Sequence, residues 1–234
     1  MGELQNRLSQ RFRGKRDVAL RNLIVAQRSG IVGPFRILDV GGRADYWARV
    51  GFDFLDANDL EILCLNYSEA ELYADKDRHP RLKTGVGDAR KLDLPDNSFH
   101  LVHSNSVIEH VGNFADKRAF ADEVRRLAPS YYVQTPYFWF PIDPHWPRFP
   151  FFHWLPMSWR HRLLCRFSLG WGRRHRDVDH AMGDLEATVL LDGSMMATLF
   201  PESRIRYEWL AILPKSMIAE RRRDPRMDSG VAAP

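Results

Sequence analysis

The chain has 234 residues, of which 44% are hydrophobic and 27% are charged, a mix typical of a globular protein that excludes a fibrous repeat or wholesale disorder. Its 34 basic and 30 acidic residues leave a net charge of +4, and a nucleic-acid-binding protein would usually show a denser basic stripe. No apolar run reaches the length of a membrane-spanning helix, and two cysteines are too few for a disulfide framework.

The first 34 residues predict a basic amphipathic helix over residues 3–28. Leu20, Leu23 and Ile24 fall on one helical face, and a Gly- and Pro-containing stretch at 30–34 ends the helix. Basic residues gather here and again at 221–226, so peripheral contact with an anionic surface stays open beside the simpler interpretation of solvated charged faces. The N-terminal residues lack the apolar segment of a secretory signal, and we expect a cytoplasmic protein.

Apolar runs alternate with helical segments along the chain, which predicts an α/β fold with a mostly parallel sheet. The predicted strands are residues 35–40, 61–66, 82–86, 99–104 and 130–134, with a helix over 113–127. Asp192 is expected to cap a helix through Leu199. Two final strands over 205–210 and 216–220 would be joined by a turn around Pro214. We expect one domain over residues 35–222 and a disordered tail over 223–234.

An aromatic-rich segment follows the fifth predicted strand. Residues 131–172 hold 14 of the 28 aromatic residues, and the prolines of 141–150 disfavour a helix or a central strand there. We expect an ordered insertion over about residues 138–185, with a loop over 173–184. Its aromatic side chains could form the wall of a ligand pocket or a second small core, and the sequence leaves both open. These side chains are Trp139, Phe140, Trp146, Phe149, Phe151, Phe152 and Trp154.

Polar and glycine residues follow the first four predicted strands. Because the carboxyl ends of parallel strands meet at one edge of a sheet, we expect these residues to surround one binding site. The first turn, residues 39–45, lacks the G-x-G-x-x-G pattern that a dinucleotide pyrophosphate requires, and Asp45 would repel a phosphate. A nicotinamide oxidoreductase is therefore disfavoured. A cofactor without phosphate groups, such as S-adenosylmethionine, fits better.

Together these segments resemble the class I S-adenosylmethionine-dependent methyltransferases, in particular the methyltransferase type 11 family. The resemblance is carried by residues 37–42, 87–89, 94–102 and 106–111 and covers roughly residues 35–137. It implies a Rossmann-like seven-stranded sheet with helices on both faces, S-adenosylmethionine as cofactor, and an antiparallel pair formed by the last two strands. The chain departs from the family pattern at two positions: the first turn lacks the third glycine, and the neutral Asn66 stands where an acid is usual. Asp45 or Asp56 could substitute for that acid.

The resemblance also implies roles for individual residues. Gly41 and Gly42 would pass close to the methionine end of the cofactor, and Asp39 would orient their loop or reach the amino group. Asn66 would bind the ribose hydroxyls. The adenine contacts would be Asp88 and Ala89, and the lining of the methyl-donor pocket would be Ser104 and Asn105.

Transfer to a hydroxyl acceptor would benefit from a general base. The candidates are His110, His145 and His153, and we favour His145 because Asp143, two residues away, could set its tautomer. The aromatic segment suits a small-molecule, lipid-linked or glycan acceptor. The alternative is a non-catalytic binding module on the same fold that recognises an anionic surface or a partner. The sequence does not give the oligomeric state.

A second group of polar residues, over 175–180, could suggest a metal site. The spacing of His175, Asp177, Asp179 and His180 is not a zinc pattern, and the adjacent Arg174 and Arg176 oppose a cation. The sequence therefore predicts no metal site.

Overall fold

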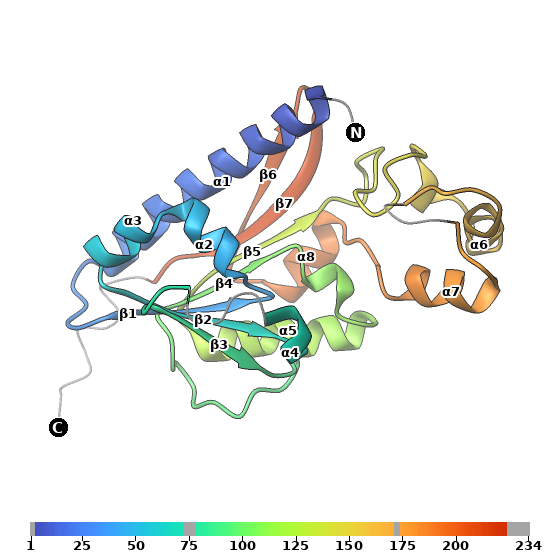
Figure 1. Ribbon diagram of the computed structural model, residues 1–234. Helices are drawn as coiled ribbons and strands as arrows, with labels where there is room; N and C mark the ends of the chain where they lie inside the picture. Colours follow the sequence, from blue (N-terminus) through green and yellow to red (C-terminus); the bar gives the residue numbers. More distant parts are fainter. Residues whose placement is uncertain (1–2, 73–77, 171–173, 224–234) are drawn as a thin grey trace. The chain divides into compact units, whose positions relative to one another are not determined.

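The computed structural model describes residues 3–72, 78–170 and 174–223 (Figure 1). The described residues form a seven-stranded sheet with the order β3-β2-β1-β4-β5-β7-β6, mostly parallel with one antiparallel hairpin, β6–β7. This confirms the predicted fold class. The strands are β1 (Phe35–Val40), β2 (Leu60–Asn66), β3 (Leu82–Val86), β4 (Leu101–Asn105), β5 (Ser130–Pro136), β6 (Arg204–Leu210) and β7 (Leu213–Arg221).

The helices connect the strands and fill the segment after β5. The predicted helices over 3–28, 113–127 and 193–199 are present with nearly the same bounds. No helix in the described ranges combines the length and the apolar character needed to cross a bilayer. The helices are α1 (Glu3–Arg28), α2 (Ala44–Val50), α3 (Phe52–Ala57), α4 (Glu69–Leu72), η2 (Ile108–His110), α5 (Phe114–Leu127), η3 (Phe152–Trp154), α6 (Met157–Arg166), α7 (Val178–Glu186) and α8 (Gly193–Leu199).

The chain divides into two compact units, which we describe separately. Unit 1 comprises Met1–Asn105, Asp122–Val133 and Glu220–Pro234, and unit 2 comprises Ser106–Ala121 and Gln134–Ala219. Of the predicted disordered tail over 223–234, residues 224–234 lie outside the described residues, and Arg223 is held by hydrogen bonds from its N–H to Gln27 and Ser130.

Unit 1 is built around β1, whose side chains are buried at five of six positions. β1 pairs in parallel with β2 on one side and with β4 on the other, so that Asp39 stands opposite both Cys64 and His103. α1, α2 and α3 lie on one face of these strands (Figure 1). Since the connections from β1 run outward to β2 and then return to β4, the carboxyl ends of β1 and β4 form the switch point at which open α/β sheets bind ligands.

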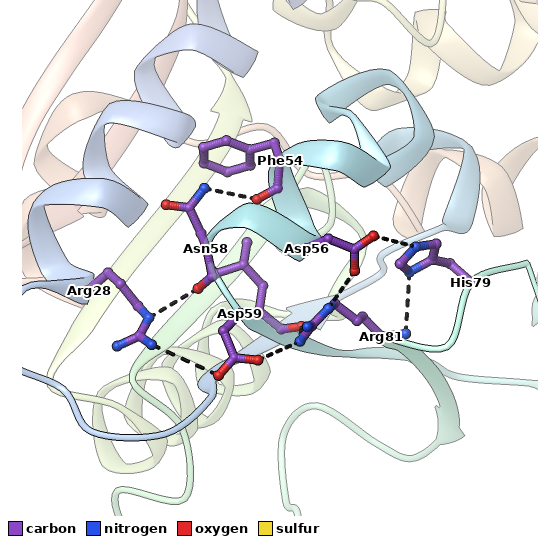
Figure 2. A network of polar contacts seen from close by, with 8 residues as sticks. Arg28, Phe54, Asp56, Asn58, Asp59, His79 and Arg81 are labelled. Atoms are coloured by element: carbon purple, nitrogen blue, oxygen red, sulfur yellow. Dashed lines mark hydrogen bonds and ion pairs between the residues drawn. The ribbon is translucent and has the colours of Figure 1, made fainter.

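A polar network holds the turn between α3 and β2 (Figure 2). Arg81 donates to Asp56 Oδ1 at 2.6 Å and to Asp59 Oδ1 at 2.7 Å, and Arg28 donates to the Asn58 carbonyl at 3.0 Å. Asp59 has a φ of 47°, which a short polar side chain tolerates better than most residues do. The network therefore joins the end of α1 to the start of β2 and β3. It also engages Asp56, which the sequence offered as a substitute ribose ligand.

Unit 2 has its own apolar cluster. It contains Trp146 and Phe152 from the aromatic segment together with residues of α6 and α7. Trp139, Phe151 and Trp154 are exposed instead. The aromatic segment thus supplies a second small core, and part of it faces solvent.

Two sequence predictions in unit 2 are wrong. Most of the loop predicted over 173–184 is α7, because Asp177 caps it by accepting from the His180 N–H and because Ala181 and Leu185 bury one face. The final turn lies at Ala211 and Ile212 rather than at Pro214, which is the second residue of β7. Proline is accepted near the start of a strand because it lacks only a ladder donor.

Candidate active site

The turn after β1 requires glycine at both predicted positions. Gly41 has a φ of 72°, and its N–H donates to the Leu65 carbonyl at 2.7 Å. A Cβ on Gly42 would lie 2.1 Å from Asp39 Oδ2, far inside contact distance. The Gly42 carbonyl accepts from the buried Asn66 amide at 2.7 Å. Asn66 therefore holds the glycine turn against the end of β2.

The Asp39 carboxylate is buried and held from two sides. Trp47 Nε1 donates to its Oδ2 at 2.7 Å, and His103 Nδ1 lies 2.6 Å from its Oδ1. The other ring nitrogen of His103 lies 3.2 Å from the Tyr46 hydroxyl, and the two rings pack with centroids 4.9 Å apart. Burial raises the pKa of Tyr46, and the negative charge of Asp39 raises it further. Tyr46 is therefore a neutral hydroxyl at the end of an Asp–His–Tyr chain.

The Asp–His–Tyr chain lines a cavity of about 250 Å³ within unit 1. It brings together four of the predicted cofactor residues and adds others that the sequence analysis missed. A histidine inside the apolar strand Leu101–Asn105 was the available signal for His103, whereas Tyr46 and Trp47 gave none. The lining residues are Asp39, Gly41, Gly42, Arg43, Asp45, Tyr46, His103 and Asn105.

The remaining predicted cofactor residues lie at neighbouring strand ends without lining this cavity. Asp88 is engaged by the Arg90 guanidinium at 2.6 Å, and this hydrogen bond holds the pKa of Asp88 below its usual range. Ala89 is half-buried beside it. Ser104 is fully buried, and its hydroxyl has no hydrogen-bond partner among the described residues. Asp45, offered as a substitute for Asn66, pairs with Arg78 at 3.1 Å.

Unit 2 brings the predicted catalytic residues together. His145 Nδ1 lies 2.7 Å from Asp143 Oδ1, as the sequence predicted, and Asp143 is buried. His145 Nε2 lies 3.1 Å from Nε2 of His110, which comes from η2, 35 residues earlier. Glu109, beside His110, is fully buried and was missed by the sequence analysis. The cluster thus contains two imidazoles between two carboxylates.

The pKa values of these groups are displaced in different directions. Burial raises the pKa of Glu109 to about 7, against the hydrogen bond from Thr135. Burial and the neighbouring His145 lower the pKa of His110. Burial also acts to lower the pKa of His145, but the Asp143 carboxylate outweighs it and raises that pKa. Displaced pKa values of opposite sign are typical of sites that move protons.

The cluster borders a cavity of about 580 Å³ within unit 2. Asp143 and Thr188 line the cavity and also touch the imidazoles, since Thr188 Oγ1 lies 3.3 Å from His110 Nδ1. His153, the third predicted base, instead has its Nε2 2.7 Å from the Phe138 carbonyl and is separate from the pair. The lining residues are Gly112, Asn113, Phe138, Asp143, His153, Met157, Arg160, Leu185, Glu186, Thr188, Val189 and Leu190.

The polar residues 175–180 form separate pairs. His180 Nδ1 lies 2.6 Å from Asp177 Oδ1, and His175 Nε2 lies 2.8 Å from Asp184 Oδ2. Asp177 also caps α7. These contacts give both acids a structural role.

A family model described as a methyltransferase domain matches residues 38–130. This stretch contains the glycine turn, Asn66, Asp88 and the end of β4. Residues 38–130 are thus similar to a methyltransferase domain. No curated protein matches the chain by sequence.

Solved structures of methyltransferases share the fold. The DszA carbon methyltransferase has a TM-score of 0.60 and 16% identity over 92% of this chain and 54% of its own. The CurJ carbon methyltransferase has a TM-score of 0.55 and 10% identity over 88% and 54%. Phosphoethanolamine N-methyltransferase 2 of Haemonchus contortus, solved with S-adenosyl-L-methionine, has a TM-score of 0.50 and 15% identity over 81% and 38%. At these identities the similarity concerns the fold alone.

The residues around the glycine turn fit S-adenosylmethionine, the cofactor that the sequence analysis expects. The absence of a Cβ at position 42 lets the glycine turn pack directly against the Asp39 carboxylate beside the cavity. The cavity beside it is lined by Asp39 and Asp45 together with Arg43, and the two acids suit a ligand with ammonium and sulfonium charges. The uncommitted Ser104 hydroxyl is a further polar group at the end of β4.

Proposed function

We propose that the methyltransferase transfers a methyl group to a hydroxyl of a small-molecule, lipid-linked or glycan acceptor. The observation that carries this proposal is the contact of Asp143, His145 and His110 beside the cavity of unit 2. A hydroxyl has to lose its proton as it is methylated, and an imidazole with an orienting carboxylate is suited to receive it.

In unit 1, the glycine turn would bind the methionine end of S-adenosylmethionine. Gly41 and Gly42 allow close approach of the backbone, while Asp39 holds the turn through Trp47 and His103 rather than reaching the ligand freely. Asn105 and Tyr46 line the same cavity. Asn66 supports the turn and the ribose side, and Asp88 with Ala89 is proposed for adenine. Ser104 is proposed for the methyl-donor pocket.

When bound, the cofactor supplies an electrophilic methyl group on a positively charged sulfur. The acceptor oxygen forms the new bond to carbon, and the electron pair of the broken carbon–sulfur bond stays on sulfur. Asp143 Oδ1 accepts a hydrogen bond from the Nδ1–H of His145. The other ring nitrogen of His145, Nε2, then faces His110. The hydroxyl proton passes to this cluster.

The cavity of unit 2 supports an acceptor with both apolar and polar parts. Phe138, Met157 and Leu185 offer apolar surface, while Asn113 and Arg160 offer donors. Such a lining is typical of small-molecule sites, in which a few polar groups orient a mostly apolar ligand. The donors suit hydroxyl or carboxyl groups on the acceptor.

The test measures transfer of a labelled methyl group to acceptors that share one scaffold and carry a hydroxyl, an amine or an activated carbon. We expect label on the hydroxyl acceptor and a loss of about 10²–10⁴-fold in kcat for His145→Gln. Calorimetric affinity for S-adenosylhomocysteine should stay unchanged in that variant. His180→Gln is the matched control, because His180 also contacts an aspartate in unit 2 but lies outside the cluster. Transfer to carbon or nitrogen alone, or full activity of His145→Gln, contradicts the proposal.

A further inference from the structure

Three side chains of unit 2 converge on one point. Glu109, His110 and His145 each offer a ligand atom, and these atoms all lie within 4.8 Å of one another. The two imidazoles meet edge to face, with ring centroids 4.8 Å apart, an interplanar angle of 85° and their Nε2 atoms separated by 3.1 Å. Such an arrangement directs both Nε2 atoms at the same small volume.

The opposite ring nitrogens face acceptors. His145 Nδ1 lies 2.7 Å from Asp143 Oδ1, and His110 Nδ1 lies 3.3 Å from the Ala187 carbonyl oxygen. A carboxylate and a carbonyl only accept, so in the tautomers in which each Nδ1 donates to them, each Nε2 keeps a lone pair. Two lone pairs 3.1 Å apart repel each other unless a cation or a shared proton lies between them. Metal-bound histidines are held in this way, with the second nitrogen donating to a carboxylate or a carbonyl.

Glu109 supplies an independent observation. Its side chain is fully buried, Oε2 accepts from the Thr135 hydroxyl at 2.9 Å, and Oε1 has no hydrogen-bond partner among the described residues. A buried carboxylate oxygen without a partner is costly. Its position beside the two imidazoles gives that oxygen a use as a third ligand.

We propose that Glu109, His110 and His145 bind one divalent transition-metal ion, with Zn²⁺ as the representative ion. Zinc bonds to nitrogen and carboxylate oxygen of about 2.0–2.2 Å place neighbouring tetrahedral ligand atoms about 3.3 Å apart. The two Nε2 atoms already have nearly this separation. Two imidazoles favour zinc or a similar ion over Mg²⁺ and Ca²⁺, which prefer oxygen ligands. The sequence analysis predicted no metal site, and the proposal departs from that prediction.

The surrounding groups support the ligands. Asp143 holds His145 in the binding tautomer. The ammonium of Lys117, which opposes a cation, donates to the carbonyls of Val111 at 3.2 Å and Gly112 at 2.7 Å, so it also fixes the loop that follows the ligands. The carboxylates of Glu109 and Asp116 act electrostatically on this ammonium and offset part of its charge.

Three protein ligands leave one tetrahedral position open, as in catalytic zinc sites. An acceptor hydroxyl bound there would lose its proton more readily, because a divalent ion lowers the pKa of a bound oxygen. This use of the ion rests on the proposed function, whereas binding of the ion does not. In the metal-bound state the imidazoles act as ligands, and the bound oxygen releases its proton to solvent or to a neighbouring base.

The test titrates the chelator-treated full chain with ZnCl₂ by calorimetry, with MgCl₂ as a comparison. We expect one saturable Zn²⁺ site per chain and far weaker binding of Mg²⁺. His110→Gln and His145→Gln should each lose at least 100-fold in affinity, and Asp143→Asn about 10–100-fold. His180→Gln should bind Zn²⁺ like the wild type. His180 contacts Asp177 and, among the described residues, does not belong to the group formed by Glu109, His110 and His145.

The opposing interpretation is a proton chain without metal. The Thr188 hydroxyl lies 3.3 Å from His110 Nδ1 and could donate to it, which would let His110 Nε2–H donate to His145. No saturable Zn²⁺ binding, or equal affinity in wild type and His110→Gln, overturns the metal proposal in favour of this chain. His110 is exposed, so its variant should fold even if Glu109→Gln does not. Zn²⁺ binding without methyl transfer to any hydroxyl would support the metal site and contradict the proposed function.

Discussion

Substitution of Gly42 by alanine should damage unit 1 through the Asp39 carboxylate. The new Cβ would lie 2.1 Å from Asp39 Oδ2 and 2.2 Å from its Cγ, about 1.3 Å short of ordinary contact at 3.4 Å. Asp39 cannot yield without giving up its contacts with Trp47 at 2.7 Å and His103 at 2.6 Å. Hydrogen bonds to a charged group contribute about 1.5–3 kcal/mol each. We therefore expect a loss of about 3–6 kcal/mol in the free energy of unfolding.

Urea unfolding measures this loss, and calorimetry with S-adenosylhomocysteine measures the accompanying loss of affinity. Gly14→Ala is the matched control in the same unit, because a Cβ there meets nothing within 4 Å, and helical Gly→Ala should stabilise by about 0.5–1 kcal/mol. In an Asp39→Gly background the clashing atoms are gone, so Gly42→Ala should cost much less. An equal cost in both backgrounds would refute the role assigned to Asp39.

Three further substitutions test individual parts of the fold. Arg81→Ala removes the ion pairs with Asp56 and Asp59 at 2.6 and 2.7 Å. Because these groups are partly exposed, we expect urea unfolding to show a loss of about 1 kcal/mol or less in the free energy of unfolding, and a smaller loss at high salt. Phe152→Ala empties the apolar cluster of unit 2, where Phe152 is fully buried, and should cost about 3–5 kcal/mol by the same measurement. Hydrogen bonds from His180 lower the pKa of Asp177 from 3.8 to about 2, so Asp177 stabilises the fold above pH about 4 and this contribution is lost as the pH falls toward 2; Asp177→Asn should flatten that part of the stability–pH curve, and an unchanged curve would contradict the assignment.

The strands of unit 1 could be predicted from apolar runs such as that of β1, or from a clear end such as that of β3. β1 and β3 have the predicted bounds, since Gly and Pro residues precede β1 and a Gly-Asp pair follows β3. α2 and α3 were missed because they contain only seven and six residues, which is too short for a helical period to be recognised.

Other elements needed information that the sequence does not display. The polar composition of Val178–Glu186 hid a helix whose buried face has only Ala181 and Leu185. The last hairpin turns at Ala211, whose φ of 53° is unusual for alanine and is imposed by the pairing of β6 and β7. Pro214 was the more obvious turn signal and misplaced the turn by a few residues.

In the cluster of unit 2, only the contact between residues close in sequence could be predicted. Asp143 and His145 are two residues apart, so their contact follows from the chain itself. Contact with His110, 35 residues away, depends on how the aromatic segment folds back onto η2. The sequence analysis did not single out Glu109, and only its burial identifies it as a group with an unsatisfied oxygen.

The strand-end residues of unit 1 show why position alone does not assign a role. Asp39 binds Trp47 and His103, Asn66 binds the Gly42 carbonyl, and Asp88 binds Arg90. These three side chains, which the resemblance directs at the ligand, are thus also part of the scaffold. A substitution at Asp39 or Asn66 should therefore lower stability and cofactor affinity together, because the glycine turn is the common cause. Loss of affinity at unchanged stability would instead indicate direct contact with the cofactor, so both quantities have to be measured on the same variant.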